Sequence, residues 1–88
     1  MIYTAEKKEI GKVKYWFSNK SVIGFETTES ITVGDTIRIT GEGGEIDFTQ
    51  TIESMQIDHE PIQVAKPGDL VGIKVVEEAS PGCCVFKI

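Results

Sequence analysis

The chain has 88 residues, of which 40% are hydrophobic and 26% charged, and it carries a formal net charge of −5. This length predicts a single domain, residues 1–88, and an acidic chain lacks the positive footprint that DNA or a long RNA backbone requires. The opening, MIYTAEKKEIG, has no apolar run typical of a signal peptide or membrane anchor, so we expect a cytoplasmic protein without membrane contacts.

The first predicted strand combines positive charge with the only tryptophan. Residues 1–20 hold five lysines against two glutamates, although the rest of the chain is acidic. In KVKYWF, alternation predicts that Val13, Tyr15 and Phe17 share one face. Lysines beside an aromatic residue bind RNA or a protein, and they also fit an amphipathic strand whose tryptophan a loop covers. The candidate partner-binding surface is Lys12, Lys14 and Trp16 from the opposite face of this strand, with Arg38 from a later one.

Alternating apolar residues predict further strands in SVIGFE, DTIRIT, DLVGIKV and the closing CCVFKI, in which Cys84, Phe86 and Ile88 share a face. In EIDFTQTIESMQI the apolar residues change parity between Ile52 and Met55, which is typical of a β-bulge. We expect a short irregular turn at residues 59–66, and no segment has helical periodicity. Ile37 and Ile39 are expected to face inward, and Met55 and Ile57 to end their strand with side chains in the core. Ile23 and Phe25 are expected to share a face, as are Val71, Ile73 and Val75.

Glycines punctuate the strands at regular places. ITVGDTI, AKPGDLV and ASPGCCV each place a glycine (Gly34, Gly68 and Gly82) just before a strand, as type II turns require. GEGGE at 41–45 predicts a hairpin loop. About six short strands with tight connections favour a small closed barrel over an open sheet.

His59 is the only histidine, and Asp58 and Glu60 flank it. The run HEPIQ lacks the second histidine of a zinc-protease motif, and Pro61 disrupts the helix that such a motif needs. We therefore predict a polar turn in which Pro61 ends strand pairing, with no catalytic, cofactor or metal site. Two alternatives stay open, namely weak metal capture by residues 58–60 and a surface contact through His59.

Cys83 and Cys84 are adjacent, so their side chains point to opposite faces of a strand and do not form an unstrained disulfide. We interpret them as small apolar residues of the last strand. A thiol nucleophile paired with His59 is the alternative, and it requires an exposed, reactive cysteine. Neither GxxxxGK[ST] nor GxGxxG is present, so we expect no nucleotide binding.

The order of these motifs resembles a known module. IGKVKYWFSNKSVIGFETTESITVGDTIRITG resembles the first half of domain II of translation elongation factors such as elongation factor Tu, and QTIESMQIDHEPIQVAKPGDLVGIKV resembles the second half, with its A-x-x-G-D-x-V-G-I pattern. The chain is also similar to the C-terminal barrel of collagenase-like peptidases, where a DFTQTIESMQIDHEP-like run fits. The resemblance covers about residues 10–88. It implies an all-β fold, a six-stranded closed Greek-key β-barrel of the elongation factor domain II type, with framework positions Gly34, Asp35, Gly68, Asp69 and Gly72.

In translation GTPases this barrel lies beside a GTPase domain and contacts tRNA or the ribosome, whereas in the peptidases it is an accessory to a separate catalytic domain. Neither catalytic domain is present in these 88 residues. The leading hypothesis is therefore a stand-alone, non-catalytic module that binds the translation machinery (ribosome, tRNA or a translation factor) or another protein. A protein partner is favoured over RNA because of the net charge of −5. The alternative is an accessory or lid subunit of a collagenase-like peptidase encoded separately.

Overall fold

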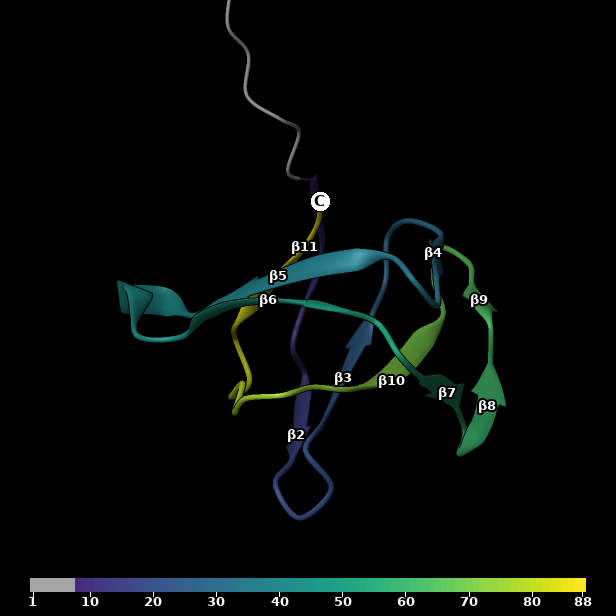
Figure 1. Ribbon diagram of the computed structural model, residues 1–88, viewed down its shortest axis with the longest axis horizontal. Helices are drawn as coiled ribbons and strands as arrows, with labels where there is room; N and C mark the ends of the chain where they lie inside the picture. Colours follow the sequence, from purple (N-terminus) through teal and green to yellow (C-terminus); the bar gives the residue numbers. More distant parts are fainter. Residues whose placement is uncertain (1–7) are drawn as a thin grey trace, which may run out of the picture.

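The computed structural model describes residues 8–88 of the chain, so Lys7 and the other residues before it in the basic segment lie outside the described part. The prediction of an all-β protein is confirmed. Residues 8–88 form eleven strands and one 3-10 turn, Glu42–Gly44, and contain no α-helix (Figure 1). This described part contains no helix of the length and apolarity that would span a bilayer.

The strands form three antiparallel sheets (Figure 1). The four-stranded sheet has the order β1-β11-β5-β6 and the five-stranded sheet β2-β3-β10-β7-β8, while β4 pairs with β9. The longer strands are β1 (Lys8–Lys12), β3 (Val22–Glu26), β5 (Thr36–Thr40), β6 (Asp47–Thr51), β10 (Leu70–Lys74) and β11 (Cys84–Lys87). The shorter ones are β2 (Tyr15–Phe17), β4 (Ile31–Thr32), β7 (Met55–Ile57), β8 (Glu60–Ile62) and β9 (Val64–Ala65).

Two short connections cross from one large sheet to the other. β1 leads directly into β2, and β6 leads directly into β7, so the outer strands of the four-stranded sheet continue into the five-stranded sheet. One apolar core lies between the sheets and contains residues of both. Ile37, Ile39 and Met55 are buried, as expected, whereas Ile57 is half-buried. The residues expected to share a face in the other strands are buried as well, namely Ile23, Phe25, Val71, Ile73 and Val75. On β11 the core takes Val85, while Cys84 and Phe86 are half-buried on the opposite face.

The predicted face of the first strand is wrong. Val13 is buried, but Tyr15 and Phe17 are 48% and 47% exposed, while Trp16 is half-buried against the core. The regular strand is interrupted at residues 13–14, between β1 and β2, and there the Val13 amide donates to the Cys83 carbonyl. Because period-two alternation holds only within one continuous strand, this interruption exchanges the inward and outward positions that follow.

Two other expectations need correction. The change of parity in EIDFTQTIESMQI is a break between β6 and β7, at residues 52–54, where the Ile52 amide bonds to the Asp35 carbonyl instead of a sheet partner. The irregularity in strand register occurs between Glu9 and Gly11 of β1. The expected irregular turn at residues 59–66 instead contains β8 and β9, each of which has a hydrogen-bonded neighbour strand.

The glycine turns are confirmed. Gly34, Gly68 and Gly82 have φ of 105°, 94° and 100°, the left-handed region that type II turns require of their third residue. In the two Gly-Asp turns the aspartate carboxylate also accepts a bond from a backbone amide three residues earlier, at 2.8 Å for Asp35 and 2.9 Å for Asp69. The GEGGE segment joins β5 to β6 as a hairpin loop, as predicted.

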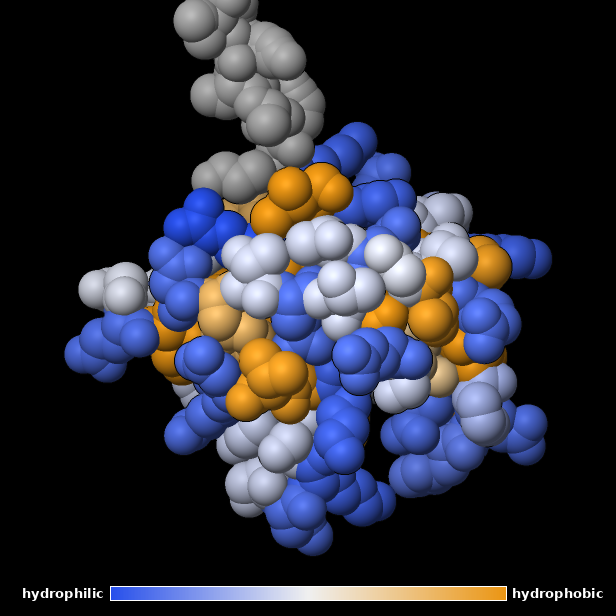
Figure 2. Space-filling model, in the orientation of Figure 1, coloured by the Kyte–Doolittle hydropathy of each residue, from blue (hydrophilic) through white to orange (hydrophobic). Residues whose placement is uncertain are grey.

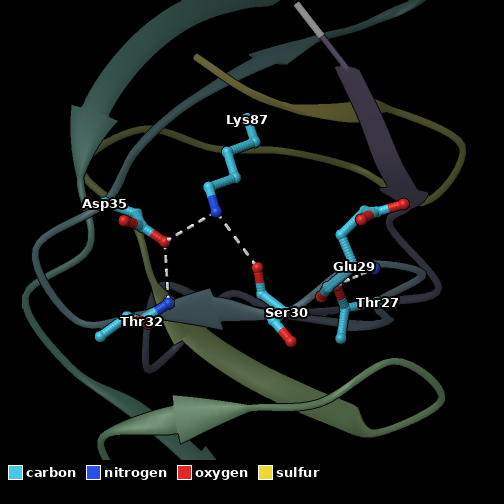
Figure 3. Close-up of polar contacts among 6 residues, drawn as sticks. All are labelled: Thr27, Glu29, Ser30, Thr32, Asp35 and Lys87. Atoms are coloured by element: carbon cyan, nitrogen blue, oxygen red, sulfur yellow. Dashed lines mark hydrogen bonds and ion pairs between the residues drawn. The ribbon is translucent and has the colours of Figure 1, made fainter.

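The end of β11 is bonded to the Gly34-Asp35 turn and to the loop before it. Lys87 Nζ lies 3.5 Å from Asp35 Oδ2 and donates to the Ser30 carbonyl at 3.2 Å (Figure 3). In the same loop, the buried Thr27 hydroxyl donates to the Glu29 carbonyl at 2.7 Å. Asp35 thus holds together a turn and the last strand, which agrees with its expected role as a framework position.

Candidate binding groove on the five-stranded sheet

The segment around His59 is a two-residue hairpin. Asp58 and His59 have φ of 52° and 67°, and β7 and β8 pair directly on either side of them. Positive φ at both central residues is the geometry of a type I′ turn, and Asp and His tolerate it better than most side chains. The prediction that Pro61 ends strand pairing is wrong. Pro61 lies in β8 and pairs with Gln56, and because β8 is an edge strand the missing N–H is tolerated.

The registers of the five-stranded sheet align five residues in one row, namely Tyr15, Gly24, Gly72, Gln56 and Pro61. The two glycines of the row have no side chain, so the outer face of the sheet is lower at β3 and β10 than at the strands on either side. The row is closely packed, because a Cβ atom added at Gly24 would lie 3.1 Å from Tyr15 Cδ2. One added at Gly72 would lie 3.3 Å from Gln56 Cγ.

This low region consists of two neighbouring hollows, which we call together the sheet groove. They measure about 200 and 410 Å³ and share Val22, Gln56, His59 and Gly72. The smaller is also lined by Tyr15, Phe17, Gly24, Asp58, Leu70 and Val71. The larger is also lined by Lys20, Ser54, Met55, Pro61 and Lys74.

The smaller hollow has exposed apolar walls. The rings of Tyr15 and Phe17 are stacked with centroids 6.2 Å apart, and Leu70 is 47% exposed. A cluster of large apolar side chains on one exposed face is typical of a contact site. This cluster is the strongest candidate functional site in the described part of the chain.

The structure distributes the predicted surface over two sheets. Lys12 and Arg38 lie on the four-stranded sheet with β11 between them. Lys12 Nζ donates to Cys84 Sγ at 3.5 Å and lies 3.4 Å from Glu9 Oε2, and these two neighbours, Cys84 foremost, raise the pKa of Lys12. Lys14 is exposed between β1 and β2, whereas Trp16 packs against the core and does not share a face with Lys12.

Arg38 is engaged by a neighbouring strand. Its Nε and Nη2 donate to both carboxylate oxygens of Asp47, at 2.8 and 2.7 Å. This two-point hydrogen bond, together with the carboxylate charge, raises the pKa of Arg38. In Figure 2, the surface over β5 and β6 is mostly hydrophilic to intermediate (blue and white), and the hydrophobic (orange) patches on that face of the molecule are separated from one another.

The other chemical alternatives gain no support. Within residues 8–88, no group of three His, Cys, Asp or Glu side chains is placed to hold a metal ion. Cys83 and Cys84 are free thiols, the first buried and the second half-buried. Cys83 lines a third hollow, of about 440 Å³, to which His59 does not contribute.

Sequence reasoning missed the sheet groove because it placed Tyr15 and Phe17 on the core side. A signal was present, since Gly24 and Gly72 interrupt two strand patterns, and glycine inside a strand marks a close approach by another group. Only the register shows that these two glycines are neighbours.

Comparison with known proteins finds similarity to proteins described as peptidases. No family model matches it. It is 37% identical over 82 residues to an uncharacterised protease of Methanocaldococcus jannaschii, a match that covers 93% of this chain but only 20% of that protein. The chain therefore spans about a fifth of the length of this curated relative.

Two solved structures share the fold. The C-terminal domain of a putative U32 peptidase of Geobacillus thermoleovorans superposes with a TM-score of 0.82 at 21% identity, covering 100% of this chain and 99% of that one. Its selenomethionine variant gives 0.81 at 21% identity, covering 89% and 96%. These relatives agree with the resemblance to collagenase-like peptidases, and they favour the peptidase-associated alternative over a contact with the translation machinery. The chain is thus similar, over nearly its whole length, to a domain found at the C-terminus of a putative peptidase.

Proposed function

We propose that the chain is a non-catalytic accessory barrel that acts together with a peptidase-type catalytic domain outside these 88 residues. The observation that carries this proposal is the match of nearly the entire chain to one fifth of a protease. The remaining four fifths of that relative leave room for a separate catalytic domain. The shared fold with the C-terminal domain of a putative U32 peptidase supports the same division of roles.

The accessory role agrees with the chemistry of the described residues. His59 is the second central residue of the two-residue turn between β7 and β8, and its positive φ is the geometry that this turn requires. The thiol of Cys84 accepts a hydrogen bond from Lys12 Nζ at 3.5 Å, and a protonated lysine cannot act as its general base. A nucleophile requires a base within hydrogen-bond reach, so these residues fit a binding role better than catalysis.

We further propose that the two large sheets close into a six-stranded Greek-key barrel built from the longer strands. The continuous passages from β1 to β2 and from β6 to β7 support closure at two corners. At the first corner the Lys14 amide bonds to the Gly24 carbonyl at 2.8 Å and the Thr28 amide to the Ile10 carbonyl at 2.9 Å. Hydrogen exchange tests this, because rapid exchange of both amides in the native protein would contradict a closed seam.

For the contact with the catalytic domain, we retain Lys12, Lys14 and Arg38 from the predicted surface. Cys84 and Phe86 are half-buried between Lys12 and Arg38 on the outer face of the four-stranded sheet. A partly apolar centre with a charged rim is typical of protein interfaces. Trp16 belongs to the support beneath the surface, because it packs against the core.

The test is affinity purification of the tagged 88-residue chain from native lysate, followed by mass spectrometry. We expect a protein with a peptidase catalytic domain to be retained, with ribosomal proteins and tRNA at background. Lys14→Glu should reduce that retention, whereas Lys66→Glu, at another exposed lysine, should not. Retention of ribosomes or tRNA in place of a peptidase would overturn the proposal.

A further inference from the structure

The two hollows of the sheet groove differ in chemistry. The smaller one is bounded by the stacked Tyr15 and Phe17 rings and by the exposed Leu70. The larger one includes the lysines Lys20 and Lys74. A ligand that fills both must therefore present an apolar group beside a polar or charged one.

The charge of the larger hollow is opposite to that of the whole protein. The chain carries a net charge of −5, yet two lysines and no carboxylate line this hollow. A concave site lined by one sign of charge concentrates ions of the other sign. The larger hollow therefore favours a carboxylate.

The two hollows adjoin, so one extended peptide can reach both. They share a common wall, and Phe17, Val22 and Lys74 are aligned on three neighbouring strands. Adjacent strands lie about 4.8 Å apart, which places the Phe17 and Lys74 backbones about 10 Å apart. In an extended peptide, residues i and i+2 point to the same side and are about 7 Å apart, so their side chains can enter adjacent hollows.

We propose that the sheet groove binds an extended peptide segment with an aromatic or large aliphatic side chain and an acidic side chain two residues away. The apolar side chain packs between Tyr15, Phe17 and Leu70, and the carboxylate lies near Lys74. Gly24 lines the smaller hollow, and Gly72 lines both. The choice of a peptide as occupant rests on the proposed accessory role beside a peptidase, whereas the pairing of apolar and acidic groups rests on the groove itself.

Peptide titration of the ¹⁵N-labelled full chain, followed by NMR, tests this inference. The probe is Gly-Gly-Phe-Gly-Asp-Gly-Gly with both ends blocked. We expect saturable shifts of the Gly24 and Gly72 amides. Asn in place of Asp should weaken binding up to about fivefold, the upper end for one exposed ion pair. Ala in place of Phe should weaken it at least as much, because the apolar contact is lost.

Variants of the protein make the test specific. Lys74→Glu should weaken binding of the Asp peptide about fivefold and strengthen binding of a peptide with Lys in its place. Lys66→Glu carries the same change of charge at an exposed lysine that lines neither hollow, and it should bind the Asp peptide like the unaltered protein. Equal effects of the two variants, shifts confined to other surfaces, or no binding at millimolar peptide would overturn the inference.

The result is separable from that of the proposed function. Peptide binding without retention of a peptidase would overturn the accessory role and leave the groove assignment standing. Retention of a peptidase without peptide binding would overturn the groove assignment alone.

Discussion

Gly11→Ala should be the most damaging small substitution in this protein. Gly11 lies in β1 at the register irregularity, and a Cβ atom there would lie 2.6 Å from Phe25 Cδ2 and 2.8 Å from the Glu26 carbonyl oxygen. Both distances are below van der Waals contact. Phe25 is fully buried, and Glu26 belongs to a paired strand, so neither group can move without disturbing the core or the sheet.

Overpacking of this kind destabilises by about 1–3 kcal/mol, and two simultaneous clashes place Gly11→Ala near the upper end. A domain of this size has a free energy of unfolding of about 5–10 kcal/mol, so about 3 kcal/mol is a large share. For a small domain each kcal/mol lowers Tm by about 4–8 °C, which predicts a decrease of about 12–24 °C.

Thermal and urea unfolding followed by circular dichroism measure this loss. Gly72→Ala is the matched control, because Gly72 is also a strand glycine, but its added Cβ would meet a flexible side-chain atom, Gln56 Cγ, at 3.3 Å. It should change stability by less than about 1 kcal/mol. A Gly11→Ala protein within about 0.5 kcal/mol of the unaltered one, or equal losses in both variants, would refute the reasoning.

Three other predictions address packing, thiol access and turns. Trp16→Ala should lower the free energy of unfolding in urea by about 2 kcal/mol, because the ring packs against the core. Phe17→Ala, at an exposed ring, should lower it by less than about 1 kcal/mol, and the opposite order would contradict the observed faces. Native alkylation followed by intact-mass measurement should modify the half-buried Cys84 first and the buried Cys83 only after unfolding. Asp69→Ala should lose about 1 kcal/mol in the same urea assay, because the Lys66 amide loses its carboxylate partner at 2.9 Å, and an unchanged midpoint would show that this bond contributes nothing.

Most of the core was predictable because period-two alternation is local. Each of β3, β5 and β10 is one uninterrupted strand, so alternate residues share a face, and the apolar residues of the inward face are buried, namely Ile23, Phe25, Ile37, Ile39, Val71 and Ile73. The glycine turns were predictable for a similar reason. A positive φ is a demand of the local backbone, and glycine meets it without steric cost.

The sheet groove was not predictable in this way. Whether Tyr15 points inward or outward depends on a backbone bond from Val13 to Cys83, a residue 70 positions later in the chain. The neighbourhood of Gly24 and Gly72 likewise depends on strand register. Neither relation leaves a periodic trace in the sequence.

The sequence by itself determined an all-β chain, its glycine turns and most of its core, because those properties depend on residues within a few positions of one another. The tertiary structure alone decided which side of each interrupted strand faces solvent and which distant side chains share a hollow. The aromatic walls and the lysines of the sheet groove come from β2, β10 and the loop after β2, and only sheet pairing brings them together.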